Sequence, residues 1–210
     1  MIKLENIKVF DFMGAINGMR NPKESWDRID SYEKDGKIYL GNNDLDLMQR
    51  LFKAGKDHRK FTRQILVSMD ITAPLYWFKE WDTYKVGTVA NSTSTMHKIM
   101  SKPFTKEMFS VDGGLNEFSV KLNNIVNDCN DLRTRYLNET YPKQKEIIWR
   151  ALIQILPNAF MQTRHLTLNY EVLYNMYYSR KTHKLSEWRE FCDIIKEELP
   201  YFKEIANMEE

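Results

Sequence analysis

No segment constrains the fold of this 210-residue chain as strongly as the one from Leu156 to Arg189. Asn169, Leu173, Met176 and Arg180 stand at positions i, i+4, i+7 and i+11, so they share one face of a predicted helix. At about 1.5 Å of rise per residue, the polar ends of this face lie roughly 16 Å apart. Two interpretations follow. The face binds a flat ligand with an anionic end, or it belongs to a core helix on which Asn169 is an N-cap or a satisfied buried amide and Arg180 reaches solvent.

Hydrophobic periodicity predicts an α+β fold, because helical and strand-like segments do not alternate regularly. Strand-like patterns cover 2–12, 58–70 and 161–168. Helical patterns cover 11–20, 23–30, 44–54, 72–84, 115–138, 141–155, 169–180 and 186–205, with an interruption near Pro200. Thr72 is the expected N-cap of its helix, and Asp35-Gly36 is typical of a hairpin turn. Neither a GxGxxG nor a GxxxxGK[ST] motif occurs, which argues against Rossmann and P-loop folds.

Composition indicates one soluble globular domain spanning residues 1–210, with 42% hydrophobic and 29% charged residues. The net charge is +2 without a long basic block, so nucleic-acid binding has little support. Aromatic residues make up 13%, which favours oligomer interfaces or pockets for flat ligands.

Cysteine and histidine spacing favours neither a disulfide framework nor a metal site. Cys129 and Cys192 form no CxxC motif, and we expect free thiols in a reducing cytoplasm. The histidines show no HExxH or HxH spacing. The N-terminus has no signal-peptide pattern, and no apolar stretch approaches 18 residues, so we expect no membrane partner.

The C-terminal segment resembles the flavin-dependent thymidylate synthases. That family has Leu-Pro, a Thr-x-Asn step, a helix with a second Asn and an Arg, a His, and then a helix rich in Trp, Glu and Arg. The corresponding residues here are Leu156-Pro157, Thr167-x-Asn169, Asn175, Arg180, His183 and Glu187-Trp188-Arg189. The match from Pro157 to Arg180 contains no gap, and the His lies one residue nearer the Arg than the family pattern places it.

The middle of the chain resembles the same family and also departs from it. The family's Gln-Trp-Phe-Arg-His-Arg reads here as Tyr76 to Trp81, YWFKEW, so Glu80 and Trp81 replace a His and an Arg. The family's Ser-containing loop reads as Asn91 to Ser94, after a loop longer by about two residues. A family Arg is replaced by Ile153. His58-x-x-Phe61-Thr62 resembles the family's strand entry, whose His faces the flavin.

The resemblance implies a thymidylate synthase-complementing-protein-like fold with a mixed sheet and long helices, assembled as a homotetramer. It implies reductive methylation of dUMP to dTMP with FAD, NADPH and methylenetetrahydrofolate. The flavin contacts would be His58, Lys79, Asn91, Asn169, Asn175 and His183. The pyrimidine-nucleotide contacts would be Tyr76, Ser92, Ser94 and Arg180. Ser94 and Arg180 would be catalytic by orienting and polarising, because the family uses no covalent nucleophile.

Each of these residues also has a structural interpretation. His58 suits a turn, Lys79 and Glu80 a solvated helix face, and the serines a soluble loop. Trp77 and Trp81, at i and i+4, suit a core or an interface. Two other functions therefore stay open: modification of another pyrimidine nucleotide, and a non-catalytic nucleotide-binding or structural oligomer that has lost flavin. Strand alternation predicts that Arg164 and His165 point to opposite faces.

Overall fold

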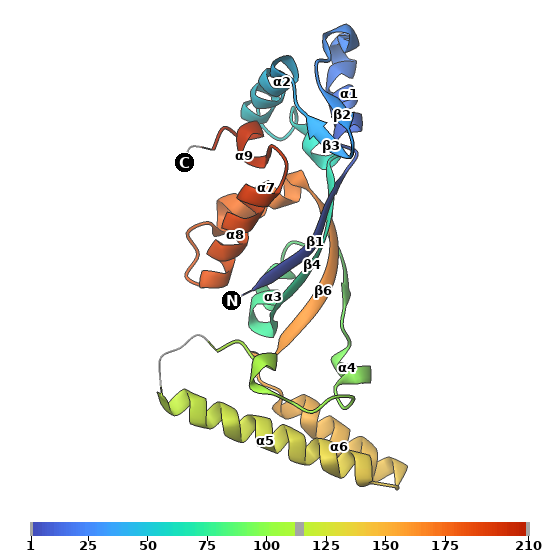
Figure 1. Cartoon of the computed structure of the whole chain (residues 1–210), viewed down its shortest axis with the longest axis vertical. Helices are drawn as coiled ribbons and strands as arrows, with labels where there is room; N and C mark the ends of the chain where they lie inside the picture. Colours follow the sequence, from blue (N-terminus) through green and yellow to red (C-terminus); the bar gives the residue numbers. More distant parts are fainter. Residues whose placement is uncertain (1, 112–115, 209–210) are drawn as a thin grey trace. The chain divides into compact units, whose positions relative to one another are not determined.

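The computed structural model of the chain describes residues 2–111 and 116–208 and is α+β, as the periodicity predicts (Figure 1). The strands are β1 (Lys3–Phe10), β2 (Tyr32–Lys34), β3 (Lys37–Tyr39), β4 (Leu66–Pro74), β5 (Val89–Ser92) and β6 (Met161–Asn169). The helices are α1 (Phe12–Arg20), α2 (Asn42–Lys53), α3 (Leu75–Trp81), α4 (Thr95–Lys98), α5 (Asn116–Asn138), α6 (Pro142–Ile155), α7 (Tyr170–Arg180), α8 (Ser186–Glu198) and α9 (Phe202–Ile205). Short 3-10 helices cover Asn21–Lys23, Trp26–Arg28, Lys60–Arg63 and Lys106–Met108.

The strands form a four-stranded sheet in the order β1-β4-β6-β5 and the hairpin β2-β3. In the large sheet, Thr72 lies beside Thr163 and Asp70 beside His165, so β4 and β6 run antiparallel. The hairpin turns at Asp35-Gly36, as predicted. Both residues have positive φ (52° and 71°), which suits the two-residue turns that join antiparallel strands.

The chain divides into two compact units. Unit 1 contains residues 1–3, 72–82 and 91–164, and unit 2 contains residues 4–71, 83–90 and 165–210. The single domain expected over 1–210 stays a prediction.

Unit 2 has an aromatic core built on α7. Tyr170 and Tyr174 are fully buried, and the Tyr174 ring stacks on Phe202 with 4.1 Å between centroids. Each buried hydroxyl donates to a backbone carbonyl, Tyr170 to Pro200 and Tyr174 to Phe202, so neither polar group is left unsatisfied. Burial raises the pKa of both phenols well above the ordinary value.

Two buried ion pairs connect the helices of unit 2. Asp44 on α2 accepts from the Arg20 guanidinium and, through its second oxygen, from Ser31. Near the start of α7, Glu171 pairs with Arg59 at 2.8 Å and accepts from the Thr62 hydroxyl. Buried charges of this kind are tolerated where partners satisfy them.

Unit 1 is built on the antiparallel pair α5 and α6, which lie side by side in Figure 1. Its core contains Ile99, Met100, Phe104, Phe109, Leu122, Cys129 and Leu152. Asn130 on α5 donates to the Phe104 carbonyl and accepts from the Phe104 N–H, which ties the preceding segment to the helix pair. Leu115, the expected first residue of this helix, lies outside the described residues.

Several predicted boundaries are wrong. Residues 58–70 are not one strand: the 3-10 helix Lys60–Arg63 comes first and β4 begins at Leu66. Thr72 is not an N-cap, because β4 continues through it and its hydroxyl bonds Thr163 across the sheet. The next helix therefore starts at Leu75 and ends at Trp81, short of residue 84. The segment 23–30 forms only short 3-10 turns, and the predicted loop 87–95 contains β5.

Candidate functional site

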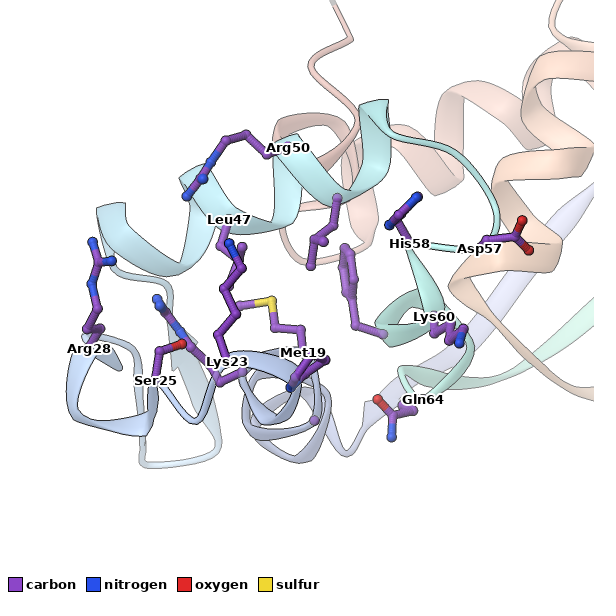
Figure 2. Close-up of a pocket in the computed structure, with 15 residues that line it drawn as sticks. Met19, Lys23, Ser25, Arg28, Leu47, Arg50, Asp57, His58, Lys60 and Gln64 are labelled. Atoms are coloured by element: carbon purple, nitrogen blue, oxygen red, sulfur yellow. The ribbon is translucent and has the colours of Figure 1, made fainter.

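A cavity of about 590 Å³ in unit 2 includes His58 in its lining (Figure 2). α1 and the loop after it form one side, α2 the other, and the segment around His58 one end. Figure 2 shows Arg28 and Ser25 at the end opposite His58. The buried Arg20–Asp44 pair holds α1 against α2 and so fixes the two walls.

The lining of this cavity is cationic with an apolar part. Lys23, Arg28 and Lys60 are exposed cations there, and Asp57 is the single carboxylate among the described lining residues. Two further guanidiniums are already paired, Arg20 with Asp44 and Arg50 with Asp46. The half-buried Leu47 and Leu51 and the buried Met19 and Phe61 complete the lining with apolar groups. Cations around an apolar surface suit an organic ligand that carries phosphate groups.

A second cluster of unit 2 surrounds Trp188, which is fully buried. The Arg180 guanidinium lies 4.9 Å from the centroid of the Trp188 ring, and the His183 ring lies 6.4 Å from it. The structure therefore brings these two predicted site residues together. Tyr84 joins them, because its hydroxyl accepts from Arg180 Nε at 2.9 Å. His183 Nδ1 accepts from the Leu185 N–H, so a neutral His183 ring carries its proton on Nε2.

The predicted face of α7 is only partly available to a ligand. Asn169 is the N-cap, and its Oδ1 accepts from the Val172 N–H at 3.1 Å, which confirms the capping interpretation. Leu173 and Met176 are fully buried, in agreement with the interpretation of this face as part of a core helix. Asn175 is half-buried.

In unit 1, Ser94 lines a separate cavity of about 420 Å³. Its hydroxyl caps α4 by accepting from the His97 N–H at 3.1 Å. Lys98 and Lys102 contribute cations to this lining, and Phe104 and Phe160 contribute apolar surface. The cavity combines hydroxyl groups, ammonium groups and rings with the Glu107 carboxylate, so cationic and anionic groups both line it.

The remaining predicted residues of unit 1 lie near the surface. Lys79, Asn91 and Ser92 are exposed, in agreement with the solvated-face interpretation of Lys79 and the loop interpretation of Ser92. Tyr76 is half-buried, and its hydroxyl lies 3.4 Å from Ser110 Oγ. Trp77 and Trp81 are buried, which confirms their placement in the core.

Arg164 and His165 point to opposite faces of β6, as strand alternation predicts. The Arg164 guanidinium stacks 4.0 Å from the Phe78 ring centroid and pairs with Asp82. His165 Nδ1 lies 2.7 Å from Asp70 Oδ1 on the neighbouring strand.

Sequence reasoning missed Lys23, Arg28 and Tyr84, because they approach the site only through tertiary packing.

The two cysteines are buried and free, as expected, and burial raises the pKa of Cys129 to about 11 and that of Cys192 to about 12. Among residues 2–111 and 116–208, no group of three or more His, Cys, Asp or Glu is arranged to hold a metal. No helix of the described chain is long and apolar enough to cross a membrane.

Comparison with solved structures identifies the fold. No protein-family model matches the sequence, and no curated protein matches it. Two solved structures of the flavin-dependent thymidylate synthase ThyX from Helicobacter pylori, each with FAD and dUMP, are similar to this chain. For one of them the TM-score is 0.68 and the sequence identity 15%, and the alignment covers 98% of this chain and 96% of the ThyX chain. For the other the TM-score is 0.67 and the sequence identity 14%, and the alignment covers 98% of this chain and 95% of the ThyX chain. The chain therefore has a ThyX-like α+β fold.

Proposed function

We propose that this chain is a divergent flavin-dependent thymidylate synthase-like protein that binds FAD and a pyrimidine nucleotide. The observation that carries the proposal is the shared fold, since both similar structures hold FAD and dUMP and match 98% of this chain. The proposed reaction is reductive methylation of dUMP to dTMP with methylenetetrahydrofolate and NADPH, or a related change to another pyrimidine nucleotide.

The His58 cavity fits an anionic dinucleotide such as FAD. Lys23 and Arg28 would bind its diphosphate, and Leu47 and Leu51 would contact its apolar surface. When bound, FAD supplies the hydride chemistry that amino-acid side chains lack. The protein's own contribution is to bind, orient and exclude water. His58 would contact the flavin in this cavity. The further flavin contacts proposed from the resemblance, Lys79, Asn91, Asn169, Asn175 and His183, lie outside the lining of the cavity.

For the nucleotide, we propose that Arg180 binds the phosphate, because a guanidinium fork matches phosphate oxygens. The hydroxyls of Tyr76, Ser92 and Ser94 would orient the nucleotide by hydrogen bonds. None of these residues would form a covalent bond to the substrate.

The first test is the visible absorbance of the purified protein. Glu80 and Trp81 stand where the family has two basic residues, and each missing charge-assisted contact removes about 1.5–3 kcal/mol of binding free energy. Two such losses weaken binding by roughly two to four decades. We therefore expect little or no flavin after purification and low dTMP formation, with saturable binding when FAD is added. Stoichiometric tightly bound FAD with robust dUMP methylation would show that other contacts compensate.

The second test concerns Arg180. Arg180→Ala should weaken dUMP binding by about 1.5–3 kcal/mol, the scale of a charge-assisted hydrogen bond. Titration calorimetry measures the change, and Lys181→Ala is the matched control, because it removes the adjacent exposed cation. Unchanged affinity in a folded Arg180→Ala protein would contradict the assignment.

A second candidate function is a nucleotide-binding or structural oligomer that has lost flavin. The exposed Lys79 and the replacements at Glu80 and Trp81 favour it. Saturable dUMP binding without any FAD or FMN binding would select this function over the first.

Self-association as a homotetramer is proposed for either function. Unit 1 exposes large apolar side chains on α5, on α6 and at the turn between them, namely Phe118, Val120, Leu137, Tyr141, Ile147 and Ile155. Exposed apolar surface of this kind is typical of protein interfaces. Sedimentation at micromolar concentration tests the proposal, and a monomer would contradict it.

A further inference from the structure

The segment Thr83–Ala90 of unit 2 contacts both ends of α7. At the C-terminal end, the Tyr84 hydroxyl accepts from Arg180 Nε at 2.9 Å. At the N-terminal end, Gly87 lies against the first turn of the helix: a Cβ on this residue would come within 3.1 Å of Val172 Cγ2 and 3.5 Å of Asn169 Nδ2. Gly87 also has φ +77°, a conformation that favours glycine. The segment that carries Tyr84 is therefore packed against α7 at a second point.

The Arg180 guanidinium packs beside both Tyr84 and Trp188, and the two rings also contact each other. Its Cζ lies 5.6 Å from the Tyr84 ring centroid and 4.9 Å from that of Trp188, and the two rings are 6.0 Å apart at 61°. Guanidinium groups bind favourably to aromatic faces. Trp188 is fully buried, so one wall of this arrangement is part of the core.

A guanidinium held in this way differs from one on a flexible surface side chain. Arginine carries substantial rotamer freedom, and binding an anion normally restricts it. Here the Trp188 ring packs against the guanidinium, and the hydrogen bond from Nε to the Tyr84 hydroxyl restricts the rotation of the group. An anion that binds Arg180 therefore meets a donor fork that is already oriented.

We propose that Tyr84 is a positioning residue for anion binding by Arg180, acting through the guanidinium and not by touching the ligand. The inference rests on the proposed function, in which Arg180 binds the nucleotide phosphate. It adds a residue from the segment between α3 and β5, where the chain is longer than the pattern it resembles.

The first experiment observes the contact without any ligand. In protein labelled with ¹⁵N-arginine, the Nε–Hε signal of Arg180, assigned by its loss in Arg180→Lys, should exchange slowly with solvent. Tyr84→Phe keeps the ring and removes the acceptor, so exchange should become about threefold to tenfold faster, the range for one hydrogen bond. Tyr178→Phe, a change at an exposed tyrosine of α7, is the control and should leave the signal unaltered. An unchanged exchange rate in Tyr84→Phe overturns the proposal.

The second experiment measures dUMP and inorganic phosphate binding by calorimetry. Tyr84→Phe should weaken both about threefold to tenfold, and Tyr84→Ala more, with thermal unfolding as the check on folding. In an Arg180→Ala background, Tyr84→Phe should have no further effect, because its influence passes through the guanidinium.

The outcomes separate the two proposals. If Arg180→Ala weakens dUMP and phosphate binding but Tyr84→Phe does not, the positioning role of Tyr84 is overturned and the proposed function stays intact. Tighter binding in Tyr84→Phe also overturns it, since Tyr84 would then compete with the anion. An equal effect of Tyr84→Phe with and without Arg180 means that Tyr84 acts by another route and overturns it as well. Unchanged binding in Arg180→Ala overturns both this inference and the assignment of Arg180 to the phosphate.

Discussion

The two units contribute equal numbers of predicted site residues but hold them differently. In unit 2, Asn169 caps α7, Arg180 contacts Tyr84 and Trp188, and His183 accepts from a backbone N–H. In unit 1, Lys79, Asn91 and Ser92 are exposed. The match to the flavin-dependent synthases that the sequence predicts is close in the unit 2 segment, and the departure that it predicts falls in the unit 1 segment. In the unit 2 segment, hydrogen bonds to backbone N–H groups or to Tyr84 therefore hold three of the predicted site residues in place.

Charged groups follow the same contrast. In unit 2 the side chains of Arg20 and Asp44 are 4% and 0% exposed, and this carboxylate accepts hydrogen bonds on both oxygens. In unit 1 the Arg164–Asp82 pair joins a mostly buried guanidinium to a carboxylate that is 47% exposed. Solvent screens the second pair, so it contributes less to stability.

The largest expected effect tests this contrast directly. Asp44→Asn removes the charge that compensates the buried Arg20 guanidinium, and breaking a buried pair costs about 3–5 kcal/mol. Asp82→Asn is the matched change in unit 1 and should cost about 0–1 kcal/mol. Urea unfolding followed by circular dichroism measures both free energies. Equal losses in the two variants would remove the distinction between the units.

The N-caps of one helix in each unit give a second comparison, with a smaller expected effect on stability. Asn169 and Ser94 each accept from the N–H three residues later at 3.1 Å, one at the 11-residue helix α7 and the other at the four-residue helix α4. Losing an N-cap costs about 0.5–2 kcal/mol, and a longer helix with a buried face should lie nearer the top of that range. We therefore expect Asn169→Ala to lower the free energy of unfolding more than Ser94→Ala.

Thermal unfolding without nucleotide or flavin measures this difference, because the caps act in the ligand-free chain. Asn169→Asp and Ser94→Thr keep a capping oxygen and serve as controls. A loss in the alanine variants that appears only when ligand is present would mean that these side chains bind ligand and contribute little as caps.

Local signals predicted a large part of the fold. The helices of residues 115–138 and 141–155 and the Asp35-Gly36 turn follow from periodicity and from glycine chemistry. The prediction of a strand from residue 58 was wrong. Phe61 and Ile65 continue the even spacing of the apolar residues in β4, but a 3-10 turn that precedes a strand can produce the same spacing. The 3-10 turn buries Phe61, and β4 then buries Val67 and Met69.

The site was less predictable than the fold. Family resemblance pointed to His58 and Arg180, and each lies in a cavity or cluster with suitable chemistry. Lys23 and Arg28 carry no local signal, since they reach the His58 cavity only when α1 is held against α2. Tyr84 stands 96 residues from Arg180 in the chain, and no periodic pattern reports such a contact.

The pKa values of two carboxyl groups near the surface provide the smallest expected effect. In unit 2 the Asn6 amide and then His165 lower the pKa of Asp70 below its ordinary 3.8, because both partners favour the charged carboxylate. In unit 1 the Thr105 hydroxyl lowers the pKa of Glu107 below its ordinary 4.5. A depressed pKa stabilises the folded chain at pH values above the pKa of the unfolded chain, and this stabilisation is lost as the pH falls through the pKa of the folded chain.

Asn6→Ala should therefore raise the pKa of Asp70 and leave that of Glu107 unchanged. Thr105→Val should raise the pKa of Glu107 and leave that of Asp70 unchanged. Carboxyl ¹³C titration by NMR between pH 2 and 6 measures the direction of both changes. An Asp70 pKa that stays depressed in Asn6→Ala but returns to its ordinary value in His165→Ala would identify the imidazole as the dominant partner.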